Sequence, residues 1–201
     1  MKIGIYGGTF DPPHMGHINA CKAFLEQVEL DKLYVIPVYT PPHKNVSSKT
    51  LPYQRFDMTR LAFEPLSDKI IVSDIEIKRE GKSYTADTIR AFKNELNNPE
   101  IYFLCGTDMI LTMDFWYNPA YIFENATIVY VRRENDHDIT DKIAQKCSFY
   151  KKKFGAKIIH VDLKAIELSS SEIRQEPLKT EEALLPEIIR YIEENGLYKE
   201  L

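Results

Sequence analysis

The 201-residue sequence lacks the features that mark membrane, disulfide-stabilised and nucleic-acid-binding proteins. It has no uninterrupted apolar run of the roughly 18 residues that a transmembrane helix needs, and the apolar run at its start is too short for a signal peptide. Its three cysteines are odd in number and form no C-x-x-C pair, so we expect buried free thiols in a reducing cytoplasm. With 26 Lys and Arg against 30 Asp and Glu, the formal charge is -4, which gives no general attraction for nucleic acid. We predict a cytoplasmic protein with no nucleic-acid or membrane partner, and the sequence leaves a homo-oligomer open.

Two common nucleotide-binding motifs are also absent. The segment Gly4-Ile-Tyr-Gly-Gly8 does not have the G-x-G-x-x-G spacing, which disfavours an ordinary nicotinamide-dependent dehydrogenase. Gly81-Lys82-Ser83 ends like a P-loop, but Glu76 stands where the first glycine of that motif must be. We therefore interpret Gly81 as a turn residue.

What is present is an ordinary globular composition in which apolar and amphipathic segments alternate. Hydrophobic residues make up 44% of the chain and charged residues 28%, which fits one domain over residues 1–201. The patterns predict strands at 2–6, 33–38, 70–77, 101–105, 127–132 and 157–162, and helices at 15–28, 53–63, 85–96, 108–114, 140–154 and 181–195. Alternation of this kind predicts an α/β fold, a Rossmann-like doubly wound and mainly parallel sheet with helices on both faces. Ligands of such sheets bind at the carboxyl ends of the strands, so the informative loops are 7–17, 39–49, 106–108 and 168–174.

The loop after the first strand carries the strongest signal. It reads GGTFDPPHMGH, with two glycines that permit close backbone approach and two prolines that stiffen the turn. His14 and His17 are three residues apart at the start of a helix, so they share a face beside exposed backbone amides. That arrangement favours an anion site, most useful where negative charge grows in a transition state. Two surface histidines or a metal pair would be the alternatives for an isolated H-x-x-H.

Further motifs follow this loop in order. They are Pro41-Pro42-His43-Lys44, Ser83-Tyr84-Thr85-x-Asp87-Thr88, Gly106-Thr107-Asp108, Trp116-Tyr117 and Ser169-Ser170-Ser171-x-Ile173-Arg174. Together they resemble the nucleotidyltransferase superfamily that carries the [HT]-x-G-H motif, and within it the bacterial nicotinate-nucleotide adenylyltransferases. The resemblance covers essentially the whole chain, with residues 142–167 matching the pattern least well.

The resemblance implies a reaction between two small molecules. ATP would transfer its adenylyl group to nicotinate mononucleotide, giving nicotinate adenine dinucleotide and pyrophosphate, with Mg²⁺ accompanying ATP and no dedicated protein metal site. Because the attacking 5′-phosphate is already anionic, catalysis would consist of positioning and charge stabilisation. The implied catalytic residues are His14, His17 and Arg174.

The resemblance also implies two groups of binding residues. Those for ATP are Gly8, Thr9, Phe10, Gly106, Asp108, Ser169, Ser170, Ser171 and Arg133. Ser171 replaces a more frequent threonine and keeps its hydroxyl. Ser169 with Glu172 also fits a helix capping box, a structural role that is compatible with phosphate binding.

The implied acceptor pocket consists of Tyr84, Thr85, Trp116 and Tyr117, with Lys44 reaching a substrate phosphate when its long loop closes. Backbone amides near Thr85 and Tyr117 would bind the nicotinate carboxylate and thus disfavour the carboxamide of nicotinamide. Ordinary packing is the alternative for the single tryptophan.

Three other functions remain to be compared with this one. An enzyme with the same fold could adenylylate nicotinamide mononucleotide or phosphopantetheine, although the shorter phosphopantetheine enzymes should lack the Ser-Tyr-Thr and Trp-Tyr elements. A non-catalytic nucleotide-binding regulator would not need groups that stabilise transition-state charge. A class I aminoacyl-tRNA synthetase is disfavoured because the chain has no K-M-S-K-S motif.

Overall fold

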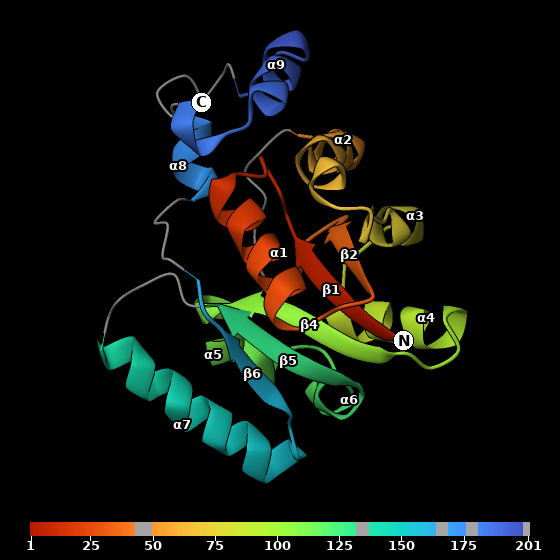
Figure 1. The fold of residues 1–201 in the computed structure, drawn as a ribbon, viewed down its shortest axis with the longest axis vertical. Coiled ribbons are helices and arrows are strands. Elements are labelled where there is room, and N and C mark those ends of the chain that lie inside the picture. Colours follow the sequence, from red (N-terminus) through yellow and green to blue (C-terminus); the bar gives the residue numbers. More distant parts are fainter. Residues whose placement is uncertain (43–49, 132–136, 164–168, 176–180, 199–201) are drawn as a thin grey trace.

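The computed structural model describes residues 1–42, 50–131, 137–163, 169–175 and 181–198, with a parallel sheet at the centre (Figure 1). The strands are β1 (Lys2–Gly8), β2 (Lys32–Pro37), β3 (Ile70–Val72), β4 (Glu100–Gly106), β5 (Ala126–Val131) and β6 (Ile158–Val161). Their order is β3-β2-β1-β4-β5-β6, and every neighbouring pair is parallel. The strand order therefore reverses between β1 and β4, which is where such a sheet opens a ligand crevice.

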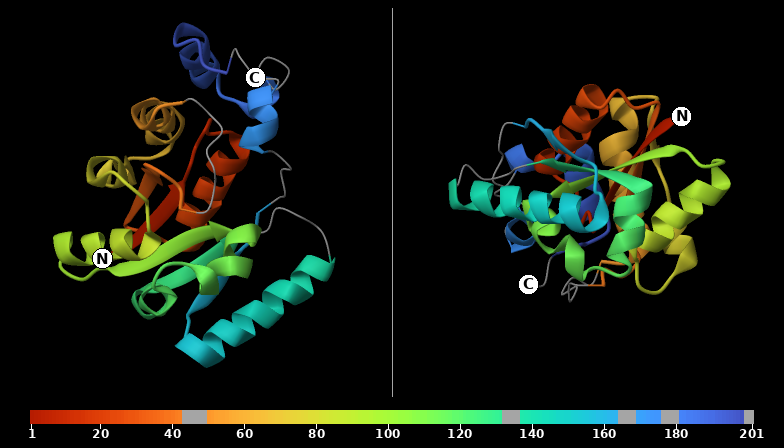
Figure 2. Two further views of the ribbon diagram at one scale, coloured as in Figure 1. Left: turned by 180° about the vertical axis from the view of Figure 1, so that it is seen from behind. Right: turned by 90° about the horizontal axis from the view of Figure 1, so that it is seen from below.

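Helices cover both faces of this sheet (Figures 1 and 2). They are α1 (Met15–Gln27), α2 (Pro52–Phe63), η1 (Glu64–Leu66), α3 (Ile75–Arg79), α4 (Thr85–Glu95), α5 (Thr107–Thr112), η2 (Met113–Phe115), α6 (Pro119–Asn125), α7 (His137–Phe154), α8 (Ser170–Gln175), η4 (Glu181–Ala183) and α9 (Pro186–Glu194). The predicted Rossmann-like α/β fold is confirmed.

The core has two parts because alternate strand residues point to opposite faces. Tyr6 and Leu104 belong to a cluster with residues of α1, α2 and α9, whereas Ile5 and Phe103 belong to a cluster with residues of α4, α6 and α7. Strands buried on both faces account for the nearly continuous apolar runs in the sequence.

The predicted strand 70–77 is wrong in its second half. β3 ends at Val72, the amide of Ser73 donates a last sheet-like hydrogen bond to the Val35 carbonyl (2.9 Å), and α3 begins at Ile75. The amide of Ile75 donates to the Ser73 hydroxyl (3.4 Å), a local bond that turns the chain out of the strand. The apolar alternation from 70 to 77 thus spans two elements.

Two helix predictions also need correction, and α6 was not expected. The last helix, predicted over 181–195, is divided into η4 and α9, because Pro186 has no amide hydrogen and begins a new helix. α6 was not predicted; it begins at Pro119 after Asn118, whose φ of 50° is left-handed. α7 starts at His137 rather than at Thr140.

The cysteine and membrane predictions can be compared with the described part of the chain. All three cysteines are free, but only Cys21 and Cys105 are buried, whereas Cys147 on α7 is half-buried. Among the helices that the structure describes, none has the length and apolar character to cross a bilayer.

Candidate active site

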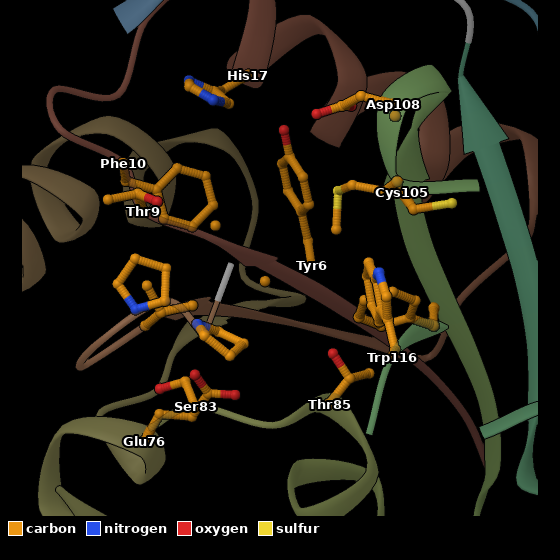
Figure 3. Close-up of a pocket in the computed structure, with 18 of the residues that line it drawn as sticks. Tyr6, Thr9, Phe10, His17, Glu76, Ser83, Thr85, Cys105, Asp108 and Trp116 are labelled. Atoms are coloured by element: carbon orange, nitrogen blue, oxygen red, sulfur yellow. The ribbon is translucent and has the colours of Figure 1, made fainter. Parts of the chain in front are cut away.

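A cavity of about 820 Å³ opens at the carboxyl ends of β1 and β4 (Figure 3). It is lined by every predicted site residue that the structure describes: Gly8, Thr9, Phe10, His14, His17, Tyr84, Thr85, Gly106, Asp108, Trp116, Tyr117, Ser169, Ser170, Ser171 and Arg174. Figure 3 shows His17 and Asp108 toward one end of the cavity and Ser83, Thr85 and Trp116 toward the other. The predicted Lys44 and Arg133 lie outside the described residues.

His14 and His17 cap the N-terminus of α1 together. His14 is the N-cap residue with extended backbone, and its amide donates to Nδ1 of His17 at 3.3 Å. The two rings lie 3.8 Å apart between centroids, and His14 is only 2% exposed. Because Nδ1 of His17 accepts, the neutral His17 ring carries its proton on Nε2 and can donate there. The two imidazoles thus lie together beside helix amides, as their spacing predicted, and donors grouped in this way favour an anion.

α8 brings its side chains to the loop that precedes α1. Nη1 of Arg174 donates to the carbonyl oxygen of Asp11 at 2.7 Å, and Nη2 donates to Oγ of Ser171 at 3.2 Å. Oγ of Ser170 donates to the carbonyl of Pro12 at 3.0 Å. The two hydrogen bonds to the loop join residues that are 163 and 158 positions apart in the sequence. Two distant segments thus share one wall of the cavity.

The predicted capping box at the start of α8 is confirmed. The amide and hydroxyl of Ser169 donate to Oε2 of Glu172 (3.2 and 2.8 Å), and the Glu172 amide donates to Oγ of Ser169 at 3.2 Å. Ser169 lines the cavity as well, so the capping role and a ligand contact are compatible.

Phe10 contributes packing rather than an exposed ring surface. It is 1% exposed, and its ring makes edge contacts with Tyr6 (5.4 Å) and His17 (5.1 Å). Its φ of 49° lies in the left-handed region, which costs a non-glycine residue free energy. A Cβ added at Gly8 would lie 2.7 Å from this ring, so the tight turn requires glycine there.

The opposite end of the cavity is aromatic. The rings of Tyr84 and Tyr117 lie 4.7 Å apart, and Trp116 makes an edge contact with Phe103 at 6.1 Å. Thr85 is the first residue of α4, where backbone amides lack intrahelical acceptors and favour an anion. An aromatic ring that bears a carboxylate would fit these two features.

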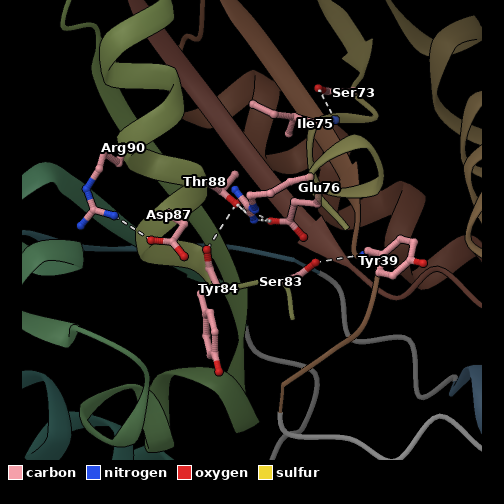
Figure 4. A network of polar contacts seen from close by, with 10 residues as sticks. Tyr39, Ser73, Ile75, Glu76, Ser83, Tyr84, Asp87, Thr88 and Arg90 are labelled. Atoms are coloured by element: carbon pink, nitrogen blue, oxygen red, sulfur yellow. Dashed lines mark hydrogen bonds and ion pairs between the residues drawn. The ribbon is translucent and has the colours of Figure 1, made fainter. Parts of the chain in front are cut away.

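A buried carboxylate that the sequence interpretation missed lies beneath this end (Figure 4). Glu76 is 5% exposed, lines the cavity, and accepts a hydrogen bond from Thr88 in the first turn of α4. Ser83 also bonds to Glu76, and Oγ of Ser83 accepts from the amide of Tyr39 at 2.9 Å. Burial raises the pKa of Glu76 against these hydrogen bonds and the charge of Arg79. Glu76 thereby connects α3, α4 and the segment after β2.

Arg55 is a second residue without an assigned role in the sequence analysis. It is 2% exposed in α2, and its guanidinium donates to the carbonyls of Thr9 (3.0 Å), Val38 (2.6 Å) and Tyr39 (2.9 Å). The loop after β1 and the segment after β2 are therefore held together by one side chain. The signal available in the sequence was a lone arginine near the start of a helix, which does not reveal this contact.

Cys105 lines the cavity but does not have the properties of a nucleophile. It is 1% exposed, and burial raises the pKa of its thiol, with a smaller contribution from Asp108. The reactive thiolate is therefore suppressed.

Known protein families and relatives resemble this chain over most of its length. The cytidylyltransferase-like family matches residues 5–176. The nicotinate-nucleotide adenylyltransferase of Bacillus subtilis is 33% identical over 201 residues, covering 98% of this chain and 98% of that protein. A Clostridium tetani protein described as a probable nicotinate-nucleotide adenylyltransferase is 36% identical, covering 98% and 99%.

Solved structures show the same fold. The nicotinic acid mononucleotide adenylyltransferase of Plasmodium falciparum complexed with APC has a TM-score of 0.71 at 23% identity, covering 98% of this chain and 96% of that chain. The same enzyme complexed with NaAD has a TM-score of 0.71 at 21% identity, covering 98% and 97%.

Proposed function

The chain belongs to the cytidylyltransferase-like family and, within it, to the nicotinate-nucleotide adenylyltransferases. From that premise we propose how its own residues carry out adenylyl transfer. It transfers the adenylyl group of ATP to nicotinate mononucleotide and releases pyrophosphate. An oxygen of the acceptor phosphate forms a bond to the α-phosphorus of ATP, and the bond between that phosphorus and the bridging oxygen to the β-phosphorus breaks.

One observation carries the proposal: a polyphosphate end and an aromatic end share a single cavity. His14, His17 and Arg174 lie with Thr85 and Trp116 around about 820 Å³. That volume lies within the roughly 300–1,000 Å³ range of small-molecule sites. A reaction that joins two nucleotides requires such a cavity to hold both.

His14, His17 and Arg174 bind and stabilise the triphosphate. Nε2 of His17 donates to the α-phosphate, where negative charge builds up during transfer, and Arg174 binds the β- and γ-phosphates. Such donors act most strongly when they are already in place before the reaction. The capping bond from His14 to His17 and the bond from Arg174 to Asp11 are contacts that support this pre-organisation. No side chain has to act as the nucleophile.

Further contacts complete the ATP site. The backbone around Gly8, Thr9 and Phe10 and the hydroxyls of α8 bind phosphate oxygens, and Gly106 and Asp108 bind the ribose. The extended backbone of Gly106 at the N-cap of α5 places Asp108 in the first turn, at the cavity wall. Arg133, outside the described residues, is proposed to lie beside the adenine.

The acceptor binds at the aromatic end. The indole of Trp116 stacks on the pyridine ring, and the amides of Thr85 and Tyr117 donate to the carboxylate. Tyr84 packs on Tyr117 at 4.7 Å and closes this wall. A carboxamide would direct its NH₂ at those amide donors, so nicotinate is favoured over nicotinamide. Lys44, outside the described residues, is proposed to contact a substrate phosphate.

Magnesium enters as part of the ATP substrate. In the described part of the chain, no three His, Cys, Asp or Glu side chains are grouped to hold a metal ion. We propose that phosphate oxygens and water supply most of the ligands of Mg²⁺, as this ion prefers when it accompanies a nucleotide. When bound, it neutralises charge on the triphosphate.

The test is an assay of the purified protein with ATP, Mg²⁺ and each of the two pyridine mononucleotides. We expect dinucleotide and pyrophosphate with a clear preference for nicotinate mononucleotide. His17→Ala should lower kcat by at least about 100-fold while the affinity for ATP falls only modestly, because the lost contact acts mainly in the transition state.

The matched control is His160→Ala. His160 lies on β6, where it contacts Tyr130 and Asp162 and does not line the cavity. Its substitution should leave kcat unchanged. Equal or faster turnover of nicotinamide mononucleotide would overturn the acceptor assignment, and pyrophosphate release no faster in wild type than in His17→Ala would support a nucleotide-binding regulator.

A further inference from the structure

A buried carboxylate stands in the loop that would receive a polyphosphate. Asp11 is 1% exposed and lines the cavity, and its carbonyl accepts the 2.7 Å hydrogen bond from Arg174. An unpaired buried carboxylate is costly, and a carboxylate that turned toward the phosphates would repel them. The side chain of Asp11 therefore needs a partner that holds it in place without removing Arg174 from the cavity.

That partner comes from the other end of the chain. Oη of Tyr198 donates to Oδ1 of Asp11 at 2.7 Å, across a separation of 187 residues. The second carboxylate oxygen, Oδ2, is 3.9 Å from Nη1 of Arg174, a long ion pair without a hydrogen bond between the two atoms. The hydroxyl of Thr50 bonds to the same phenol. Tyr198 thus connects the loop before α1 with Thr50, which lies just before α2.

The local backbone turns Tyr198 toward this loop. After α9, the amide of Leu197 donates to the carbonyl of Ile192 at 3.0 Å, and Gly196 adopts a φ of 61°. Tyr198 itself has a φ of 61°, a left-handed conformation that is unfavourable for a residue with a side chain. The contacts of the phenol stabilise the conformation that brings it to Asp11.

We propose that Tyr198 is a positioning residue for the phosphate end of the site, which acts through Asp11 to keep Arg174 directed at the triphosphate. This inference rests on the proposed function, since it assigns Arg174 to ATP. Without the phenol hydroxyl, Oδ1 of Asp11 loses its donor. The carboxylate, already 3.9 Å from Nη1 of Arg174, then draws the guanidinium into a closer ion pair. Part of the positive charge is then diverted from ATP.

The chemistry of the phenol suits this role. Burial raises the pKa of Tyr198, and the neighbouring charge of Asp11 raises it further. The phenol therefore keeps its proton at all physiological pH values and remains a donor. A donor that never ionises holds the carboxylate without adding a charge to the anion site.

The experiment compares Tyr198→Phe with Tyr191→Phe. Tyr191 on α9 donates the same type of hydrogen bond to Oδ2 of Asp57 at 3.0 Å, but neither residue lines the cavity. Both variants lose one tyrosine–aspartate hydrogen bond, and Tyr198→Phe also loses the contact with Thr50, so both should be destabilised, Tyr198→Phe somewhat more. The pair separates an effect on the phosphate site from a general effect on the C-terminal segment.

We expect Tyr198→Phe to lower kcat about tenfold, the loss expected from one misdirected charge-assisted contact. The dissociation constant for inorganic tripolyphosphate, measured by calorimetry, should rise about fivefold, and the KM for the acceptor should stay within about twofold. Tyr191→Phe should match wild type in all three. The inference is overturned if Tyr198→Phe matches wild type, or if both variants lose kcat and tripolyphosphate affinity equally.

Failure of the proposed function is a separate outcome. A wild-type protein that makes no dinucleotide contradicts the proposed reaction, whereas tripolyphosphate binding still tests the role of Tyr198. Circular dichroism melts verify that the variants fold. Should Tyr198→Phe not fold, Thr50→Val, which removes the other hydrogen bond of the same phenol, is measured instead and should raise the tripolyphosphate dissociation constant; an unchanged value overturns the inference.

Discussion

The guanidinium of Arg55 in α2 donates a 3.0 Å hydrogen bond to the carbonyl of Thr9, which lies 46 residues earlier in the chain. The same group donates to the carbonyls of Val38 and Tyr39, at 2.6 and 2.9 Å. Two segments that follow neighbouring parallel strands are therefore held at a fixed separation by one buried cation. Because both segments border the cavity, the position of Arg55 affects the site without a contact to a substrate.

Arg55→Met should therefore reduce both stability and activity. Methionine fills much of the same space but leaves the carbonyls of Thr9, Val38 and Tyr39 without their donor. We expect a loss of about 2–4 kcal/mol in the free energy of unfolding, measured by urea denaturation. A fall in kcat/KM should accompany it in protein that remains folded.

Arg60→Met is the matched control for Arg55→Met. Arg60 lies on the same helix, but its side chain is 53% exposed and pairs with Glu64 at 3.0 Å. Exposed pairs of this kind contribute little, so the loss should stay below about 1 kcal/mol. Equal losses in the two arginine variants would contradict the bridging role of Arg55.

Local patterns in the sequence predicted most of the sheet and the histidine pair at the start of α1. His14 and His17 lie within one helical turn, so their proximity follows from spacing alone. The position of that turn follows from parallel connectivity, which brings the loops after β1 and β4 to one edge. The resemblance to a known family supplied the pairing of these loops with α8 and the aromatic end.

Contacts between distant polar residues could not be predicted from the sequence. Asp11 and Tyr198 are 187 residues apart, and neither an aspartate before two prolines nor a tyrosine near the C-terminus signals a partner. Glu76 lay in a segment with the alternation of a strand, where a glutamate would be expected to face solvent. Its burial depends on Thr88 in another helix, which is tertiary information.

The two glycines at the end of β1, Gly7 and Gly8, should differ in their tolerance of alanine. A Cβ at Gly8 would lie 2.7 Å from the Phe10 ring, which is itself packed and cannot move freely, whereas a Cβ at Gly7 would meet nothing within 4 Å. Overpacking of this kind costs about 1–3 kcal/mol. Thermal or urea unfolding should therefore show a clear loss for Gly8→Ala and little change for Gly7→Ala. Equal stability of the two variants would contradict the close contact at Gly8.

Asp114 should stabilise the fold in a pH-dependent manner. Burial alone would raise its pKa, but hydrogen bonds from Lys146 and Tyr150, both at 2.8 Å, hold the pKa below its ordinary value. A carboxyl whose pKa is lowered on folding contributes stability above its unfolded-state pKa, and this contribution is lost as the pH falls through its folded-state pKa. We expect Asp114→Asn to cost about 1–3 kcal/mol at pH 7. The difference from wild type in urea unfolding should shrink below about pH 4.

Asp74→Asn provides the comparison for Asp114. Asp74 forms an exposed pair with Lys78 at 3.1 Å, in which the two side chains are 38% and 75% exposed. Its substitution should change stability by less than about 1 kcal/mol at either pH. A difference between Asp114→Asn and wild type that did not vary with pH would contradict the charge-assisted contact.

Glu76 should show the opposite pH dependence. Burial raises its pKa above the ordinary value, with hydrogen bonds from Thr88 and Ser83 opposing that change. The folded state therefore binds the proton of Glu76 more tightly than the unfolded chain does. The contribution of Glu76 to the free energy of unfolding is greatest below its unfolded-state pKa, and it is lost as the pH rises through its folded-state pKa. Glu76→Gln keeps an oxygen acceptor for Thr88 but does not titrate. Urea unfolding at several pH values should show that the stability of wild type relative to Glu76→Gln decreases as the pH rises from about 4 to neutrality. A constant or increasing difference would show that burial does not disfavour the charged carboxylate.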